Sequence, residues 1–325
     1  MPQPTMNDVH VDAILTNISV AYLQRQENFI AEKVFPVIPV DKKSDKYFQY
    51  TKNDWFRDEA QRRADGTESA GSGYNLTTST YSTDVFAFHK DVGDQTIANA
   101  DAPLNPLREA AEFVTHRILL RKELQFVTDF FTTGIWSEDV TGVAGTPGAG
   151  ETKQWSDYTS SDPIDNIEEA KQEILSNTGM EANTLILGYE VFRQLKNHPD
   201  LVDRIKYTSS QTITTDMLAA MFDIPRVMVA KAVKATNVEG AAEAYDFAYG
   251  KKALLCHVAT NPGLLTPSAG YTFNWTGVSG GIGATIGTSS FRMESLKATR
   301  VEAEMAFDNK VVGADLGYFW TDIVA

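Results

Sequence analysis

The feature that most constrains this chain is a stretch of helical composition about as long as the whole molecule. Asn105 can cap a helix, Pro106 suits its first turn, and no glycine or proline follows until Gly134. The pattern predicts a helix over residues 106–133, which at 1.5 Å per residue is roughly 42 Å long. A compact chain of this size has a radius of gyration of only about 20 Å, so the fold must be built along this helix.

The side chains of this stretch divide into two faces. An apolar stripe begins at Leu107 and continues, slightly rotated, to Phe131. We expect the charged residues to form a solvated face. They are Arg108, Glu109, Glu112, Arg117, Arg121, Lys122 and Glu123.

The acidic composition limits the partners of the chain. Its 325 residues carry 29 Lys and Arg against 43 Asp and Glu, and this charge of −14 disfavours tight binding of nucleic acid or an anionic membrane. No signal peptide or apolar run of membrane-spanning length is visible, and Cys256 is the only cysteine. We expect a soluble protein that is made in the cytoplasm and has no disulfide framework.

No sequence pattern typical of a catalytic or cofactor site stands out. Glu151 follows the Gly-rich segment 145–150 where a phosphate loop needs a lysine, and segment 280–287 lacks the dinucleotide fingerprint. The five histidines have no metal-ligand spacing, and no serine lies in a nucleophile elbow. We therefore expect no catalytic residue, no cofactor and no metal, and favour an assembly protein over an enzyme.

The regions before the long helix are extended. Residues 1–45 are predicted to form an arm with one amphipathic stretch at residues 14–22, and residues 46–92 one long hairpin. The hairpin's strands are expected over 46–56 and 74–92, joined by a polar tip. Because the tip has almost no apolar residue to anchor it, we expect a neighbouring molecule to support it.

After a Gly-rich loop, helices and strands alternate. Helices are predicted over 162–179, 189–196, 201–206 and 215–222, and strands over 184–187, 226–230 and 252–259. Residues 291–325 return to strand patterns. The whole chain is therefore an α+β protein.

This order of parts resembles the major capsid proteins of tailed bacteriophages, the Hong Kong 97 type of capsid fold. Segments 165–171, 178–188, 191–199, 267–275 and 308–318 are similar in kind to sequences of that family. The resemblance implies an N-arm at 1–45, an extended loop (E-loop) at 46–92, and a peripheral domain with the spine helix at 93–160. It further implies an axial domain at 161–290, with 263–270 or 277–287 as loops at the capsomer axis, and C-terminal strands at 291–325.

The resemblance implies that subunits form hexamers and pentamers of an icosahedral shell, which encloses double-stranded DNA without binding it specifically. The expected partners are other copies of the chain, a portal, decoration proteins and a scaffold protein. The scaffold would be separate, because too few residues precede the hairpin to hold one. Assembly is expected in the host cytoplasm, and the product is the virion capsid. Contacts with neighbouring subunits are expected at Arg57, Arg62, Arg63, Asp65, Glu68, Tyr74, Phe35 and Tyr22.

Two alternatives remain open. An encapsulin-type bacterial compartment shares the fold, although the long arm counts against it, and an enzyme with a site assembled from distant residues is a more distant possibility. Some relatives cross-link their subunits by a Lys–Asn isopeptide bond. Nothing in the sequence context selects any residue for that reaction, so we expect a non-covalent shell. The residues considered are Lys46, Lys52, Lys90, Asn309 and Glu304.

Overall fold

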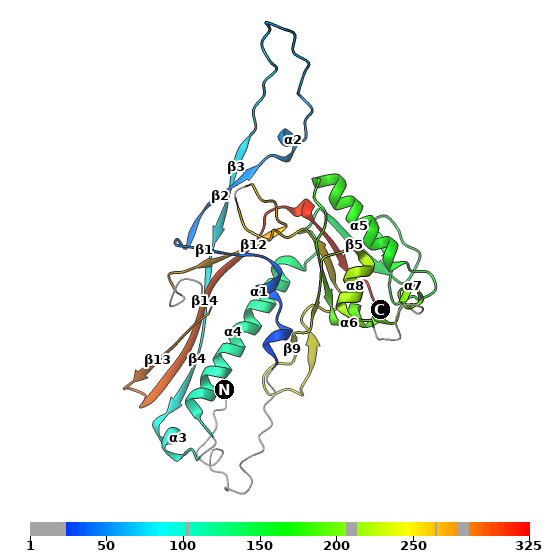
Figure 1. The fold of residues 1–325 in the computed structure, drawn as a ribbon. Coiled ribbons are helices and arrows are strands. Elements are labelled where there is room, and N and C mark those ends of the chain that lie inside the picture. Colours follow the sequence, from blue (N-terminus) through cyan, green and yellow to red (C-terminus); the bar gives the residue numbers. More distant parts are fainter. Residues whose placement is uncertain (1–23, 102–103, 206–212, 264, 279–285) are drawn as a thin grey trace.

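The computed structural model describes residues 24–101, 104–205, 213–263, 265–278 and 286–325. The predicted amphipathic stretch at 14–22 and most of the Gly-rich segment 277–287 lie outside these residues. The long helix α4 (Pro106–Phe130) lies beside an elongated sheet and reaches a second, six-stranded sheet with its C-terminal end (Figure 1). A two-stranded hairpin projects from the body.

Helix α4 begins as predicted, since the Asn105 side chain accepts a hydrogen bond from the Arg108 backbone N–H at 3.2 Å. It ends at Phe130, three residues earlier than expected. Phe131 leaves the helical conformation and its ring packs edge-on against Tyr249, with 4.8 Å between ring centroids. A buried contact distant in sequence therefore ends the helix before Gly134.

The elongated sheet packs against the N-terminal half of α4. Its strands are β1 (Val37–Val40), β12 (Gly270–Trp275), β14 (Ala298–Val311) and β13 (Gly287–Met293) in that order, and β4 (Asp84–Gly93) pairs with β14. Alternate β14 residues, Val301, Ala303 and Met305, meet Val114 and Ile118 of the helix. The side chains that alternate along this C-terminal strand thus form the face that α4 covers.

The central strands of the six-stranded sheet are buried on both faces. Its order is β6 (Glu151–Lys153), β5 (Glu138–Val143), β15 (Gly317–Thr321), β11 (Ala253–Cys256), β7 (Thr184–Gly188) and β8 (Arg226–Ala230). On β7, Leu185 and Leu187 face one core while Ile186 faces the other. The second core contains the C-terminal end of α4, which therefore joins the two sheets.

The other face carries four helices: α5 (Pro163–Thr178), α6 (Tyr189–Lys196), α7 (Pro199–Ile205) and α8 (Thr215–Phe222). Helices α6 and α8 have the predicted bounds. Helix α5 begins where the Asp162 carboxylate accepts the backbone N–H groups of Ile164 and Asp165, and ends at Gly179 with φ of 68°. These ends were readable in the sequence because capping is local.

The remaining elements are short. They are η1 (Gln26–Asn28), α1 (Ala31–Val34), α2 (Lys52–Trp55), α3 (Asp94–Asn99), η2 (Ala314–Leu316), and two hairpins, β2 (Ser44–Tyr50) with β3 (Leu76–Ser82) and β9 (Val233–Ala235) with β10 (Tyr245–Phe247).

The predicted strand over 74–92 is two strands that have different partners. β3 pairs with β2, and after Thr83 the chain continues as β4 on β14. Likewise, the first predicted strand ends at Tyr50 and the helical turn α2 follows. The alternation of side chains is the same in β3 and β4, so it could not reveal the change of partner.

The sheets also cross the expected domain boundaries. β5 and β6 precede residue 160 yet belong to the six-stranded sheet, and β12 precedes residue 290 yet belongs to the elongated sheet. Strand β1, from the expected arm, is also part of the elongated sheet. Strand pairing over long sequence separations causes these differences, because local patterns do not specify the partner strand.

Candidate assembly interface

The hairpin β2–β3 leaves the body and continues to a long tip. Seven residue pairs join the strands, from Ser44 with Ser82 to Tyr50 with Leu76. Every residue from 55 to 78 is exposed, and the tip's hydrogen bonds are local, such as the 3.3 Å bond from the Thr67 N–H to the Ala64 carbonyl. The tip therefore gains little support from its own chain.

Six of the eight expected contact residues lie on this exposed segment. They are Arg57, Arg62, Arg63, Asp65, Glu68 and Tyr74. Tyr22 lies outside the described residues. Phe35 is a correction: it is only 2% exposed, and its ring packs on Phe126 and Phe130 of α4 at centroid distances of 5.9 and 4.6 Å. Because Phe35 belongs to the core, its side chain is unavailable to a neighbour.

Sequence reasoning missed an aromatic cluster at the root of the tip. The rings of Tyr50, Trp55 and Tyr74 lie 5.6–6.1 Å from one another. Trp55 is 54% exposed and Tyr74 61%. Apolar rings held together on an otherwise polar projection are typical of a surface that another protein covers. The sequence did contain a signal for this cluster, because aromatic residues lie on both sides of a tip that has no aromatic residue of its own.

The root of the hairpin is fixed to the body. Tyr81 stacks on Phe273 of β12 with 4.6 Å between ring centroids. At the junction with β4, the Thr83 N–H donates to the Lys43 carbonyl at 2.9 Å and the Ser82 N–H donates to the Asp308 carboxylate at 2.8 Å. The direction of the projection is therefore set by the elongated sheet.

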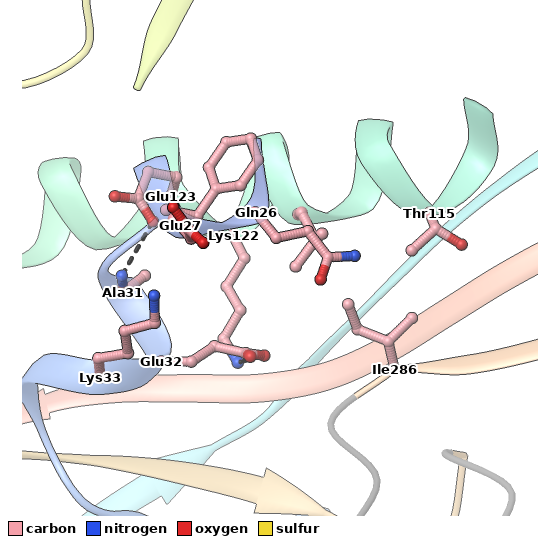
Figure 2. Close-up of a pocket in the computed structure, with 11 residues that line it drawn as sticks. Gln26, Glu27, Ala31, Glu32, Lys33, Thr115, Lys122, Glu123 and Ile286 are labelled. Carbon is pink, nitrogen blue, oxygen red and sulfur yellow. Dashed lines mark hydrogen bonds and ion pairs between the residues drawn. The ribbon is translucent and has the colours of Figure 1, made fainter. Parts of the chain in front are cut away.

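A second connection holds the start of the described chain to α4. The Glu123 carboxylate is fully buried and accepts hydrogen bonds from the backbone N–H groups of Ile30 and Ala31 and from the Tyr249 hydroxyl, the last at 2.7 Å. Its neighbour Lys122 extends to Glu32 at 2.8 Å (Figure 2). A cavity of about 460 Å³ lies beside this connection.

Lys122 and Glu123 therefore do not belong to the solvated face predicted for them. Burial raises the pKa of Glu123 and lowers that of Lys122, in both cases against the effect of their partners. Sequence periodicity missed these residues because the polar groups that satisfy them lie about 90 residues away or further.

The structure also brings together a serine, a histidine and an aspartate. Ser161 Oγ lies 3.0 Å from His198 Nε2, and His198 Nδ1 lies 3.5 Å from Asp200. Nδ1 accepts the Asp200 N–H at 3.4 Å, and the Ser161 hydroxyl donates to the Asp157 carbonyl at 2.7 Å. Because the Ser161 hydroxyl is bonded to a backbone carbonyl and His198 is fully buried, we interpret the cluster as a structural anchor for the start of α7.

Two of the candidate cross-linking residues are engaged within the subunit. Asn309 is buried, where its amide donates to Asp129 at 2.8 Å and accepts from Thr272 at 3.0 Å. Lys52 forms an ion pair with Asp315 at 2.5 Å. These contacts favour the expected non-covalent shell.

Among the described residues, no group of three or more His, Cys, Asp or Glu side chains is arranged to hold a metal ion. None of the described helices is long and apolar enough to cross a membrane.

Similarity to known proteins assigns this architecture. The family model described as phage major capsid protein E matches residues 147–274. The major capsid protein of Burkholderia phage BcepMu is 25% identical over 323 residues, which cover 96% of each chain, and that of Pseudomonas phage JBD67 is 25% identical over 97% of each. The chain is therefore similar to phage major capsid proteins over almost its whole length. The projecting hairpin is then the part of a capsid protein with the least support from its own subunit.

Solved structures show the same fold at lower identity. A phage-related protein from Bordetella bronchiseptica RB50 has a TM-score of 0.67 and 24% identity, covering 92% of this chain and 94% of its own. The capsid protein of cyanophage P-SCSP1u has a TM-score of 0.63 and 10% identity, and the match covers 97% of this chain and 93% of that one. An encapsulin complex from Synechococcus elongatus PCC 7942 has a TM-score of 0.59 and 11% identity, and the match covers 96% of this chain and 93% of that one. The Hong Kong 97 type of α+β fold is thereby confirmed, while the capsid assignment depends on the phage relatives because encapsulins share the fold.

Proposed function

We propose that this capsid protein assembles with copies of itself, as hexamers and pentamers, into an icosahedral shell around double-stranded DNA. The observation that carries the proposal is the projecting hairpin, in which every residue from 55 to 78 is exposed and the tip forms only local hydrogen bonds. A shell supplies that support, because each subunit lies against several others and many modest contacts add up.

Within this proposal, the hairpin tip is the contact surface toward the next subunit. Arg57, Arg62 and Asp65 offer charged groups there, and Tyr74 an aromatic one. Arg63, Glu68 and, from the arm, Tyr22 complete the proposed set. The tip carries both positive and negative side chains. Its binding to a neighbouring subunit would therefore depend on how individual charges are paired and not on the net charge of the tip.

The regional division also stays a proposal: an arm at 1–45, an extended loop at 46–92, a peripheral domain at 93–160, an axial domain at 161–290 and C-terminal strands at 291–325. The sheets favour shifting β5 and β6 to the axial domain and β12 to the peripheral one.

The role so proposed is structural, without catalysis or a cofactor. Assembly in the host cytoplasm would use a scaffold protein and a portal, with decoration proteins as further partners, and would lead to the virion. The charge of −14 supports a wall that encloses DNA without holding it.

The test is to purify the protein and measure particle size by negative-stain electron microscopy and sedimentation velocity. Closed shells, or free hexamers and pentamers, are expected. A monomer or dimer that stays so at high concentration and with a scaffold partner supplied would contradict the proposal.

The fold alone favours one other function, an encapsulin-type compartment, since an encapsulin shares it over 96% of this chain. The contents of particles isolated from the natural source decide between the two. We expect double-stranded DNA, whereas an enclosed enzyme would favour the compartment.

A further inference from the structure

An apolar groove lies where the projecting hairpin meets the body. Its volume is about 580 Å³, and it is bounded by β2, α2, the end of α5 and the segments before β12 and at η2. Four large apolar side chains on its walls are exposed: Phe48 by 54%, Trp55 by 54%, Phe56 by 63% and Leu265 by 67%. A contiguous aromatic surface of this kind is costly to leave in water.

A small apolar knob lies at the opposite edge of the molecule. The loop of the hairpin β9–β10 carries Val238, which is 78% exposed, and β10 begins with Tyr245, which is 64% exposed. In Figure 1, β9 lies at the lower edge of the body and the projecting hairpin at the upper edge. The knob and the groove are therefore separate patches on different parts of the molecule.

The knob is held in place. Its strand β9 exchanges two hydrogen bonds with the Gln24 side-chain amide, at 2.6 and 2.9 Å through the backbone of Val233. On the other strand, Phe247 packs against Tyr189 with 5.1 Å between ring centroids. A supported hairpin can offer its tip to a partner without a large loss of conformational freedom.

Two different patches on opposite edges are what a ring of identical subunits requires. Such a ring uses a head-to-tail interface, in which one patch of each subunit contacts the other patch of the next. A two-fold contact would instead need one self-complementary patch.

We propose that the groove at the hairpin root binds the β9–β10 tip of a second copy of this chain. The inference rests on the proposed shell function, since it names which surfaces meet within a capsomer. Val238 and Tyr245 would enter the groove. One wall of the groove carries Trp55 and Phe56, and the other carries Leu265. Apolar side chains that pair in this way are typical of interface centres.

Charge at the rim fits this pairing. The knob carries two carboxylates, Glu239 and Glu243, and the Glu243 carboxylate is hydrogen-bonded to the Tyr245 side chain. Next to Phe56, the Arg57 side chain is 63% exposed and forms a loose ion pair with Glu59 at 3.8 Å. Arg57 can therefore turn to a carboxylate of the incoming tip.

The first test is cross-linking of assembled particles with a short bis-maleimide. The protein suits it, because its single cysteine, Cys256, is fully buried. The double variant Trp55→Cys with Val238→Cys should give a ladder of multimers larger than dimers on a denaturing gel, while each single variant should give monomers. Dimers from a single variant would indicate a two-fold contact and overturn the proposal. Monomers from intact shells of the double variant would overturn it and leave the shell function standing.

The second test measures assembly without cross-linking. Val238→Ser with Tyr245→Ser should raise the protein concentration needed for assembly by about tenfold or more, since apolar anchors dominate interface affinity. The matched control Val202→Ser, at a 41% exposed position on α7, should leave it unchanged. Arg57→Glu should impair assembly and Glu239→Arg should restore it. Unchanged assembly of the knob variant would contradict the proposal, whereas failure of the unaltered protein to assemble would contradict the shell function.

Discussion

The projecting hairpin and the six-stranded sheet are both built from β-strands, yet they are stabilised in different ways. In the sheet, every residue of β7 and of β11 is buried, and each of these strands contributes side chains to both hydrophobic cores. In the hairpin, one residue of β3 is buried and the tip has none. The sheet is therefore stabilised within its subunit, whereas the hairpin depends on its root and, in our proposal, on a neighbour.

The largest effect on the free energy of unfolding is expected in the sheet. Leu185→Ala removes a fully buried side chain from β7 and leaves a cavity, which should lower the unfolding free energy by about 2–5 kcal/mol. Denaturant titration of the unassembled protein measures it. The control Leu265→Ala, at a 67% exposed position, should change stability little, and equal losses in both variants would remove the contrast.

A smaller effect is expected at the hairpin root. Tyr81→Ala removes the ring that stacks on Phe273 and should cost about 2–4 kcal/mol. Tyr81→Phe keeps the ring and loses only a 3.4 Å hydrogen bond to the Lys42 carbonyl, so it should cost less than about 1 kcal/mol. Amide hydrogen exchange of residues 44–50 should rise in the alanine variant alone. An unchanged rate would mean that the stack does not fix the root.

The ion pair between the root and the body should matter less, and only above acidic pH. Lys52, together with Ser137, lowers the pKa of Asp315. Because the folded pKa lies below the unfolded one, the stabilisation is present above the ordinary aspartate pKa and is lost as the pH falls through the folded value. The side chains are 42% and 43% exposed, so solvent screens them.

Asp315→Asn should therefore cost at most about 1 kcal/mol at neutral pH, and the difference from the unaltered protein should vanish in acid. Unfolding free energies at a series of pH values measure this. A difference that grows in acid would contradict the assigned direction, and Asp58→Asn in the exposed tip provides the control.

The smallest change in unfolding free energy is expected for the largest change in sequence, a deletion within the hairpin tip. Deleting residues 62–71 removes only exposed groups, so the unfolding free energy should stay within about 0.5 kcal/mol of the original. Assembly should nevertheless fail, as seen by sedimentation. Unfolding of this variant would show that the tip belongs to the subunit's own core.

The same comparison explains what could be predicted from the sequence. Helices with local end signals were found with their bounds, as for α5 between Asp162 and Gly179. The exposed tip was found from its lack of apolar residues. Both features are set by residues close together in the chain.

Features set by distant partners were missed. The burial of Glu123 depends on Tyr249, and that of Phe35 on α4. The change of partner at Thr83 depends on β14, which lies over 200 residues later. In each case the local pattern was compatible with exposure or with a continuous strand, and only the packed partner decided between them.

The junction at Thr83 also has a mechanical consequence. β3 and β4 follow one another with a single residue between them, so a load on the tip passes directly into β4. β4 is joined to β14 by a ladder from Asp84 with Phe307 to Gly93 with Ala298. A pull along that line loads the whole ladder in shear, so its hydrogen bonds must break together rather than one after another. Tension between neighbouring subunits would therefore act on the strongest direction of the elongated sheet.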